Sequence, residues 1–176
     1  MARIPVIAVV GAGSAAEEVL EIAKSVGEAI SERGFHLVCG GKQGVMAAVC
    51  QGFRFARNEL NTTRALAIGL LPEETSDFAN EFVDLALPTG IGIARNALII
   101  RMADGIVSVG GGSGTLSELA YAWQMGKPIA AMATSGGWSS RLAGERIDDS
   151  RVEPIFSAVS AHEALAYLIA RMEEME

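Results

Sequence analysis

Residues 104–115 read Asp-Gly-Ile-Val-Ser-Val-Gly-Gly-Gly-Ser-Gly-Thr. The apolar half, Asp104–Val109, is rich in β-branched residues and predicts a short buried strand. Gly110–Gly114, four glycines in five positions, follow at once, and a helical pattern then runs from Thr115 to Met125. A strand that enters a helix through a tight glycine turn is the repeating unit of a parallel α/β sheet.

The same unit recurs along the rest of the chain, because short apolar runs alternate with helical patterns. The predicted strands are Ile4–Val10, Phe35–Cys39, Ala65–Leu71, Phe82–Leu87, Asp104–Val109 and Ile129–Met132, and the short apolar piece Ile155–Val159 is a seventh candidate. The predicted helices are about Ala15 to Arg33, about Val45 to Ala56, Pro88-Thr89-Gly90 to about Met102, Thr115 to Met125, and Ser160 to about Glu173. We therefore expect one domain over residues 1–176, a Rossmann-like, doubly wound parallel sheet of about six or seven strands with helices on both faces.

Some residues between these elements predict where a helix begins or ends. Ser14 and Glu17 have the spacing of a capping box, and Gly34 suits the position just after a helix. The stretch Thr134–Arg151 is polar and predicts a long loop, of the kind that is often functional or mobile. Trp138 within it predicts a lid, an interface residue, or a side chain packed on its own domain.

Composition narrows the class of protein. The apolar share is 50%, the formal net charge is −7, and no cluster of lysine and arginine stands out, so we expect no nucleic-acid partner. No segment predicts a signal peptide or a membrane span, which favours the cytoplasm and no membrane partner. Cys39 and Cys50 belong to no metal-binding pair, so we expect buried free thiols and no metal site.

The strongest candidates for a ligand site are three glycine clusters, Gly11–Gly13, Gly40–Gly44 and Gly110–Gly114. Each follows a predicted strand, and ligands of open parallel sheets bind beyond the carboxyl ends of the strands. Backbone N–H groups that are not shielded by a Cβ, together with the positive end of a helix dipole, suit a phosphate. The predicted phosphate-binding residues are Gly11, Gly13, Ser14, Gly40, Gly41, Gly44, Arg95, Gly111, Gly112, Ser113, Gly114 and Thr115. The alternative for each cluster is a tight turn alone.

Two familiar nucleotide motifs fail. Gly11–Ala16 matches the dinucleotide pattern G-x-G-x-x-A, but the position for the ribose-binding acid at the end of the second strand is Gly40-Gly41. Neither Lys42 nor Lys127 is followed by the serine or threonine of a P-loop. The sequence therefore favours neither NAD nor a nucleoside triphosphate.

Arg95 and Glu118 are the charged residues nearest to these loops. Arg95 lies at the start of a predicted helix, where a cation opposes the helix dipole unless an anion is present. Glu118 lies near the start of the helix after Gly110–Gly114, so the two side chains are expected at one crevice. The alternatives are a solvated arginine and, for Thr115 and Glu118, a capping box.

These residues resemble the Lonely-guy (LOG) superfamily, whose "lysine decarboxylase" label finds no supporting residues here. Gly111–Glu118 matches its signature G-G-x-G-T-x-x-E, and Thr89-Gly90, Ala94-Arg95-Asn96 and Gly40–Met46 fit the same pattern. One branch of the superfamily contains phosphoribohydrolases, which cleave the N-glycosidic bond of nucleoside 5′-monophosphates. The other contains molybdenum cofactor carrier proteins.

Arg95-Asn96 and the triple glycine Gly110–Gly112 are more similar to the carrier-like branch. The resemblance implies a protein that requires no cofactor of its own and binds a phosphorylated, nucleotide-like or pterin-phosphate ligand, such as molybdenum cofactor. It also implies a homodimer or homotetramer. The alternative is a phosphoribohydrolase in which Arg95 anchors the phosphate and Glu118 activates water or stabilises the cationic sugar.

Overall fold

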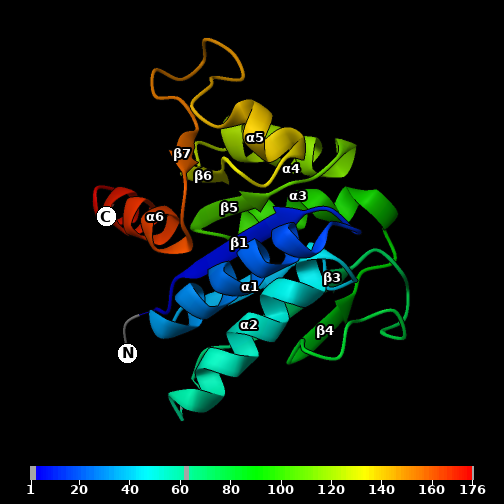
Figure 1. Cartoon of the computed structure of the whole chain (residues 1–176). Helices are drawn as coiled ribbons and strands as arrows, with labels where there is room; N and C mark the ends of the chain where they lie inside the picture. The colour runs from blue at the N-terminus through cyan, green and yellow to red at the C-terminus, as the bar shows by residue number, and fades with distance from the viewer. Residues whose placement is uncertain (1–2, 62–63, 176) are drawn as a thin grey trace.

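The computed structural model of the chain describes residues 3–61 and 64–175. Its strands form a seven-stranded sheet in the order β4-β3-β2-β1-β5-β6-β7, and every adjacent pair is parallel (Figure 1). The strands are β1 Val6–Gly11, β2 His36–Cys39, β3 Ala67–Leu71, β4 Leu85–Pro88, β5 Gly105–Val109, β6 Ile129–Met132 and β7 Phe156–Ala158. The predicted α/β class and parallel topology are confirmed.

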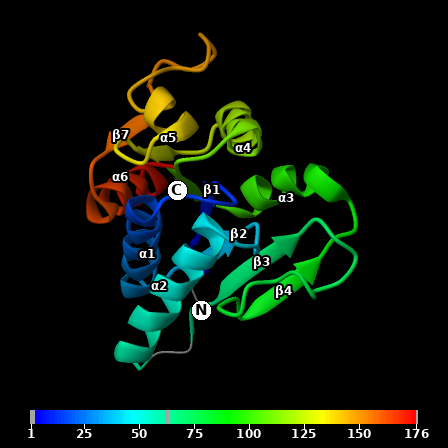
Figure 2. The same cartoon turned by 45° about the vertical axis from the view of Figure 1, so that its right-hand side comes forward.

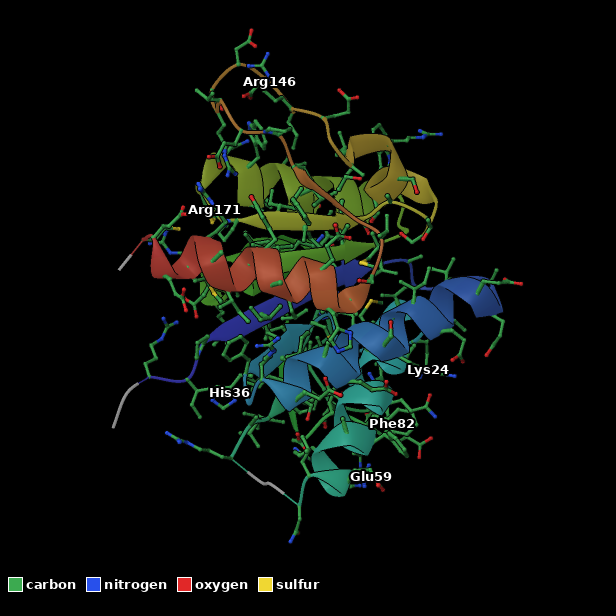
Figure 3. All side chains as sticks on the ribbon, turned by 60° about the vertical axis from the view of Figure 1, so that its left-hand side comes forward. Lys24, His36, Glu59, Phe82, Arg146 and Arg171 are labelled. Atoms are coloured by element: carbon green, nitrogen blue, oxygen red, sulfur yellow. The ribbon has the colours of Figure 1, made fainter. Side chains whose placement is uncertain are left out.

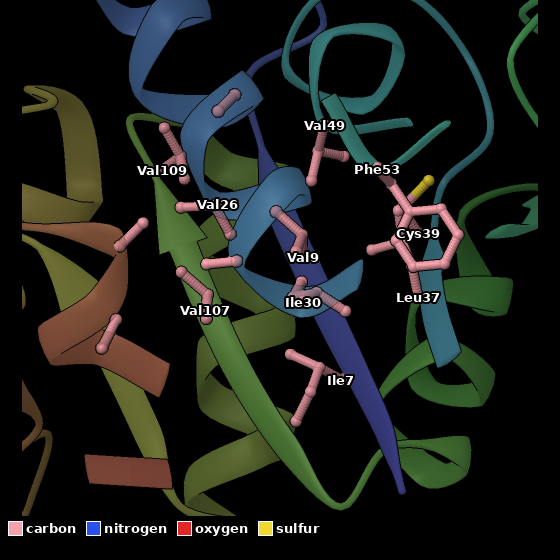
Figure 4. Packing of buried hydrophobic residues seen from close by; sticks show 14 of the residues in the cluster. Ile7, Val9, Val26, Ile30, Leu37, Cys39, Val49, Phe53, Val107 and Val109 are labelled. Carbon is pink, nitrogen blue, oxygen red and sulfur yellow. The ribbon is translucent and has the colours of Figure 1, made fainter. Parts of the chain in front are cut away.

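Helices cover both faces of the sheet, because alternate strand residues are apolar on both sides. The helices are α1 Glu17–Glu32, α2 Val45–Glu59, α3 Arg95–Met102, α4 Ser113–Gln124, α5 Gly137–Leu142 and α6 Ala161–Glu173, with a 3-10 turn η1 at Gly92–Ala94. Ile7 and Val9 of β1 pack against α1, α2 and α6 (Figure 4), whereas Ala8 and Val10 face α3 and α4.

The order of the strands creates a crevice at the carboxyl end of the sheet. The chain leaves β1 toward β2, β3 and β4 on one side and returns to β5 on the other side of β1. The carboxyl ends of β1 and β5 are neighbours, because Gly11 pairs with Val109. The loops that follow these two strands therefore lead away from each other and leave a crevice between them. Figure 2 shows α3 and α4 as neighbours, and both pack on the same face of the sheet. The amino end of β1 and the last turn of α6 lie at the opposite edge (Figure 1).

Some helix boundaries differ from the prediction. Ser14 does not cap α1, whose N-cap is Ala16 without a side-chain bond, so the capping box of Ser14 and Glu17 is wrong. Ser160 does cap α6, and its side chain accepts a hydrogen bond from the backbone N–H of Glu163. Gly34 has the expected positive φ of 68° after α1.

The predicted loop Thr134–Arg151 is wrong in its first part, because it contains α5. Six residues with two leading glycines carry little helical signal, and tertiary bonds hold this turn instead. The rest of the loop protrudes from the molecule, with Arg146 near its tip (Figure 3). It is tied down by the Trp123 indole N–H, which donates to Asp148 at 2.8 Å, and by Arg151, which stacks 4.6 Å from the same ring.

Two further expectations concern the core and the membrane. Cys39 and Cys50 are buried free thiols, as predicted, with their Sγ atoms 3.6 Å apart. In the part of the chain that the structure describes, no helix combines the length and the apolar character needed to cross a bilayer.

Candidate functional site

A cavity of about 200 Å³ opens at the carboxyl ends of the central strands. Six of the predicted site residues line it, namely Gly11, Gly40, Arg95, Gly114, Thr115 and Glu118. The sequence reasoning missed five other lining residues, Val9, Val10, Met46, Ile93 and Asn96. Four of these are apolar, and nothing in a single sequence distinguishes an apolar cavity wall from the core.

Arg95 is the first residue of α3, and its guanidinium reaches into this cavity rather than into solvent. The side chain is only 11% exposed. Its Nη1 donates to Asn96 and lies 3.5 Å from Oε1 of Glu118, while Nε is buried without a partner. Since an arginine carries five N–H donors, most of this fork is unused within the described residues. The solvated alternative for Arg95 is therefore wrong.

Gly40 makes room for the guanidinium. A Cβ at Gly40 would lie 2.7 Å from Nη2 of Arg95, closer than real contacts allow. The absent side chain therefore lets the charge lie against the end of β2, beside the cavity.

Glu118 lies in the second turn of α4, facing Arg95. The capping box with Thr115 is wrong, because α4 begins at Ser113, two residues earlier than predicted, and its N-cap is Gly112 without a side-chain bond. The Glu118 side chain is 9% exposed. Burial raises the pKa of its carboxyl to about 7, against the opposing effect of Arg95. Such a group can hold or release a proton near neutral pH.

The loop after β5 presents a row of free backbone donors. Gly110 and Gly111 have φ values of 61° and 97°, which side chains rarely adopt. The carbonyl of Gly110 accepts a hydrogen bond from Ser139 N at 3.1 Å, and that of Gly111 accepts one from Trp138 N at 3.0 Å. Within the described ranges, the five N–H groups of residues 111–115 have no partner, and the first intrahelical bond is donated by Leu116. Such a row at a helix start suits an anion.

The other two glycine clusters serve mainly to bring the loops together. Gly44 has a φ of 69° and packs against Ala12 and Gly13, where a Cβ would lie 2.4 Å from the backbone. The N–H of Val45 donates to the carbonyl of Ala12 at 2.9 Å, so it is not free for a ligand. Gly41 similarly packs against the Cα of Gly69 in β3.

The predicted phosphate-binding residues thus fall into three groups. The cavity is lined by Gly11, Gly40, Arg95, Gly114 and Thr115, and the free N–H groups of Gly111, Gly112 and Ser113 directly precede the last two of these in the chain. Four others do not line the cavity: Gly13, Ser14, Gly41 and Gly44.

Asn96 connects the two helix starts and was not predicted as a site residue. Its Oδ1 accepts from Arg95, and its Nδ2 donates to Ser117 Oγ at 3.1 Å. Ser117 in turn donates to the carbonyl of Gly114 at 2.7 Å. The arginine is therefore coupled to the glycine loop through two neutral side chains. The sequence offered a signal, because Arg95-Asn96 belongs to the pattern that resembles the carrier-like branch.

Lys42 is engaged elsewhere, although it follows a glycine pair. It forms an ion pair with Glu73, and this bond lowers the pKa of the Glu73 carboxyl. Its Nζ also lies 5.4 Å from the centre of the Phe78 ring. Arg95 is therefore the cation that the cavity contains among the described residues.

With this geometry in place, a family model described as the SLOG cluster4 family matches residues 4–165. The chain belongs to the SLOG cluster4 family. An uncharacterised protein of Archaeoglobus fulgidus is 40% identical to this SLOG cluster4 chain over 126 residues, which are 72% of the chain and 78% of that protein.

Solved structures agree with this placement. The structure of TM1055 has a TM-score of 0.82 at 29% identity and covers 96% of this chain and 99% of its own. The molybdenum cofactor binding protein of Rippkaea orientalis has a TM-score of 0.78 at 28% identity, and the match covers 97% of this chain and 98% of that protein. The molybdenum cofactor carrier protein of Chlamydomonas reinhardtii has a TM-score of 0.75 at 27% identity, covering 98% and 99%. The SLOG cluster4 chain is thus LOG-like and near the carrier branch.

Proposed function

We propose that this SLOG cluster4 protein binds a small phosphorylated ligand, either nucleotide-like or a pterin phosphate. The observation that carries the proposal is the row of free N–H groups at residues 111–115, two of which line the cavity, together with the guanidinium of Arg95 in the same cavity, whose Nε has no partner within the described residues. A phosphate is the common group that pairs with both kinds of donor, and a guanidinium fork binds its oxygens two at a time.

The nature of the rest of the ligand follows from the cavity and the neighbours. The apolar residues Val9, Val10, Met46 and Ile93 also contribute to the lining of the cavity, and cavities with a partly apolar lining commonly hold ring systems. Two similar structures are described as molybdenum cofactor binding or carrier proteins. We therefore include molybdenum cofactor among the ligands, as cargo that the protein holds rather than as a cofactor that it requires.

The test is calorimetry of the purified protein with AMP, GMP and molybdenum cofactor. We expect one of them to bind below millimolar, and Arg95→Ala to weaken binding by about tenfold to a hundredfold, the range of a charge-assisted bond pair. Arg101→Ala, an exposed arginine on the same helix, should leave binding unchanged. Binding of none of the three ligands below millimolar would exclude the proposal.

A second function is favoured by the buried carboxyl of Glu118 next to Arg95. In a phosphoribohydrolase, water and a nucleoside 5′-monophosphate would give free base and ribose 5-phosphate, with Glu118 acting on the water or the sugar and Arg95 on the phosphate. Release of base from AMP, followed by chromatography, would support this function if Glu118→Gln abolished it. Equal release by the variant would exclude Glu118 as the catalytic group. The carrier proposal expects no release.

The remaining expectations belong to the same proposal. We propose that residues 1–176 act as one domain in the cytoplasm, without a nucleic-acid or membrane partner. We also propose a homodimer or homotetramer, supported by exposed apolar side chains on edge strand β4 and on α3, such as Leu85, Leu98 and Met102.

A further inference from the structure

The Arg95–Glu118 pair is an incomplete ion pair. Both side chains are about nine-tenths buried, yet their closest charged atoms are 3.5 Å apart. Within the described residues, Arg95 is the one group besides burial that acts on the Glu118 carboxyl, and Nε of Arg95 has no partner. Buried carboxylates usually collect several hydrogen bonds. The charge of Glu118 therefore depends on one long contact with one cation.

An anionic ligand in this cavity would compete for that cation. The free N–H groups of residues 111–115 would hold the ligand beside Arg95, whose fork turns more readily to a doubly charged phosphate than to a single carboxylate. Glu118 would then face a second anion in a space of about 200 Å³ without its counter-charge. Two like charges at such a distance cannot both remain ionised at low cost.

We infer that binding of a phosphomonoester at this site is coupled to the uptake of one proton from solvent by the carboxylate of Glu118. The inference rests on the proposed ligand-binding function and adds its dependence on pH. No other bond forms or breaks: the carboxylate becomes a carboxylic acid, and the ligand keeps its charge.

No other titratable group near Glu118 can replace Arg95 as its positively charged neighbour. Among the residues that the structure describes, Arg95 from α3 is the one charged group that shifts the pKa of Glu118. Glu73, on the loop after β3, senses Arg95 but is paired with Lys42. Cys39, at the end of β2, is a buried thiol whose Sγ contacts Cys50. Neither of these two can supply positive charge to Glu118 when the ligand takes Arg95.

The direction of the pH dependence follows from the sign of these effects. In the free protein burial raises the pKa of Glu118 to about 7, and Arg95 holds it from rising further. A bound phosphate cancels the influence of Arg95, so the pKa of the bound form is higher. Between the two pKa values the affinity must fall as the pH rises, by up to about tenfold per pH unit. Well below pH 7 Glu118 is already protonated, and the coupling disappears.

The experiment is calorimetry with AMP at about pH 8, in buffers of different ionisation enthalpy. At this pH the phosphate of AMP, with a pKa of about 6, is fully ionised and takes up no proton. The slope of the observed enthalpy against the buffer enthalpy gives the number of protons taken up. We expect a slope that approaches one proton for the wild-type protein and zero for Glu118→Gln, whose affinity should not vary from about pH 7 to 8.5.

Glu59→Gln is the matched control, because it removes a carboxylate from the far end of α2 (Figure 3), about 20 Å along the helix from the cavity residue Met46. It should keep the proton uptake. If Glu118→Gln does not fold, the wild-type affinity alone decides, since it must weaken from about pH 7 to 8.5. AMP binding with no uptake and a flat pH profile would overturn the coupling and leave the proposed function standing. Absence of binding to AMP, GMP and molybdenum cofactor would remove the proposed function itself.

Discussion

At the residue scale, Gly40 places a charge by lacking a side chain. Its backbone φ is not in the left-handed region, so alanine fits the chain, but the new Cβ would meet Nη2 of Arg95 at 2.7 Å. The guanidinium is the end of a flexible side chain and would move away. We expect Gly40→Ala to melt within a few degrees of wild type while affinity for the bound phosphate falls roughly tenfold, or about 1.4 kcal/mol. Thermal melts and calorimetry measure the two effects; an unchanged affinity would show that this position of Arg95 is not used.

Single residues also show what a sequence can and cannot predict about a site. Arg95 and Glu118 were expected at one crevice because each lies near the start of a helix and the two helix starts were expected to be neighbours, and their 3.5 Å contact confirms it. The roles of Glu118 and Thr115 as a capping box were wrong, because the boundary of α4 decides them and boundaries shift by a residue or two. Asn96 was missed because its side chain could face solvent or Ser117, and only the packing of α3 on α4 decides.

At the element scale, α5 acts as a brace for the glycine loop. Ser139 is fully buried, and both its N–H and its hydroxyl donate to the carbonyl of Gly110. These bonds hold the Gly110 carbonyl, at the residue directly before the row of free N–H groups. We expect Ser139→Ala to cost about 1 kcal/mol of stability and to weaken phosphate binding as well.

Ser140→Ala is the matched control, because its hydroxyl bonds to Ala133 and Gly136 instead of the glycine loop. Urea denaturation and calorimetry should show a stability loss in both variants and an affinity loss only in Ser139→Ala. Equal affinities would contradict the role of α5 as a brace. No sequence pattern predicted this helix, because its stability comes from contacts with a segment 25 or more residues away. The strands were predictable because their apolar runs are local.

At the scale of the whole molecule, large apolar side chains are exposed on edge strand β4 and on α3. Leu98 and Met102 of α3 are 42% and 37% exposed, and Leu85 of edge strand β4 is 44% exposed. Exposed apolar side chains on an edge strand and on a helix favour association. We expect sedimentation to show a dimer or tetramer that Leu98→Asp shifts toward the monomer. Val152→Asp, at a residue 90% exposed on the protruding loop, should leave the assembly unchanged; a monomeric wild type would contradict the proposal.

The arrangement of the sheet has a practical consequence for handling the protein. β1 starts, and α6 finishes, at the edge of the sheet away from the glycine loops (Figure 1). A biotin or affinity handle attached at either terminus would therefore anchor the molecule to a sensor chip with the mouth of its cavity turned toward the flowing solution. Immobilisation should then leave small solutes free access to Arg95.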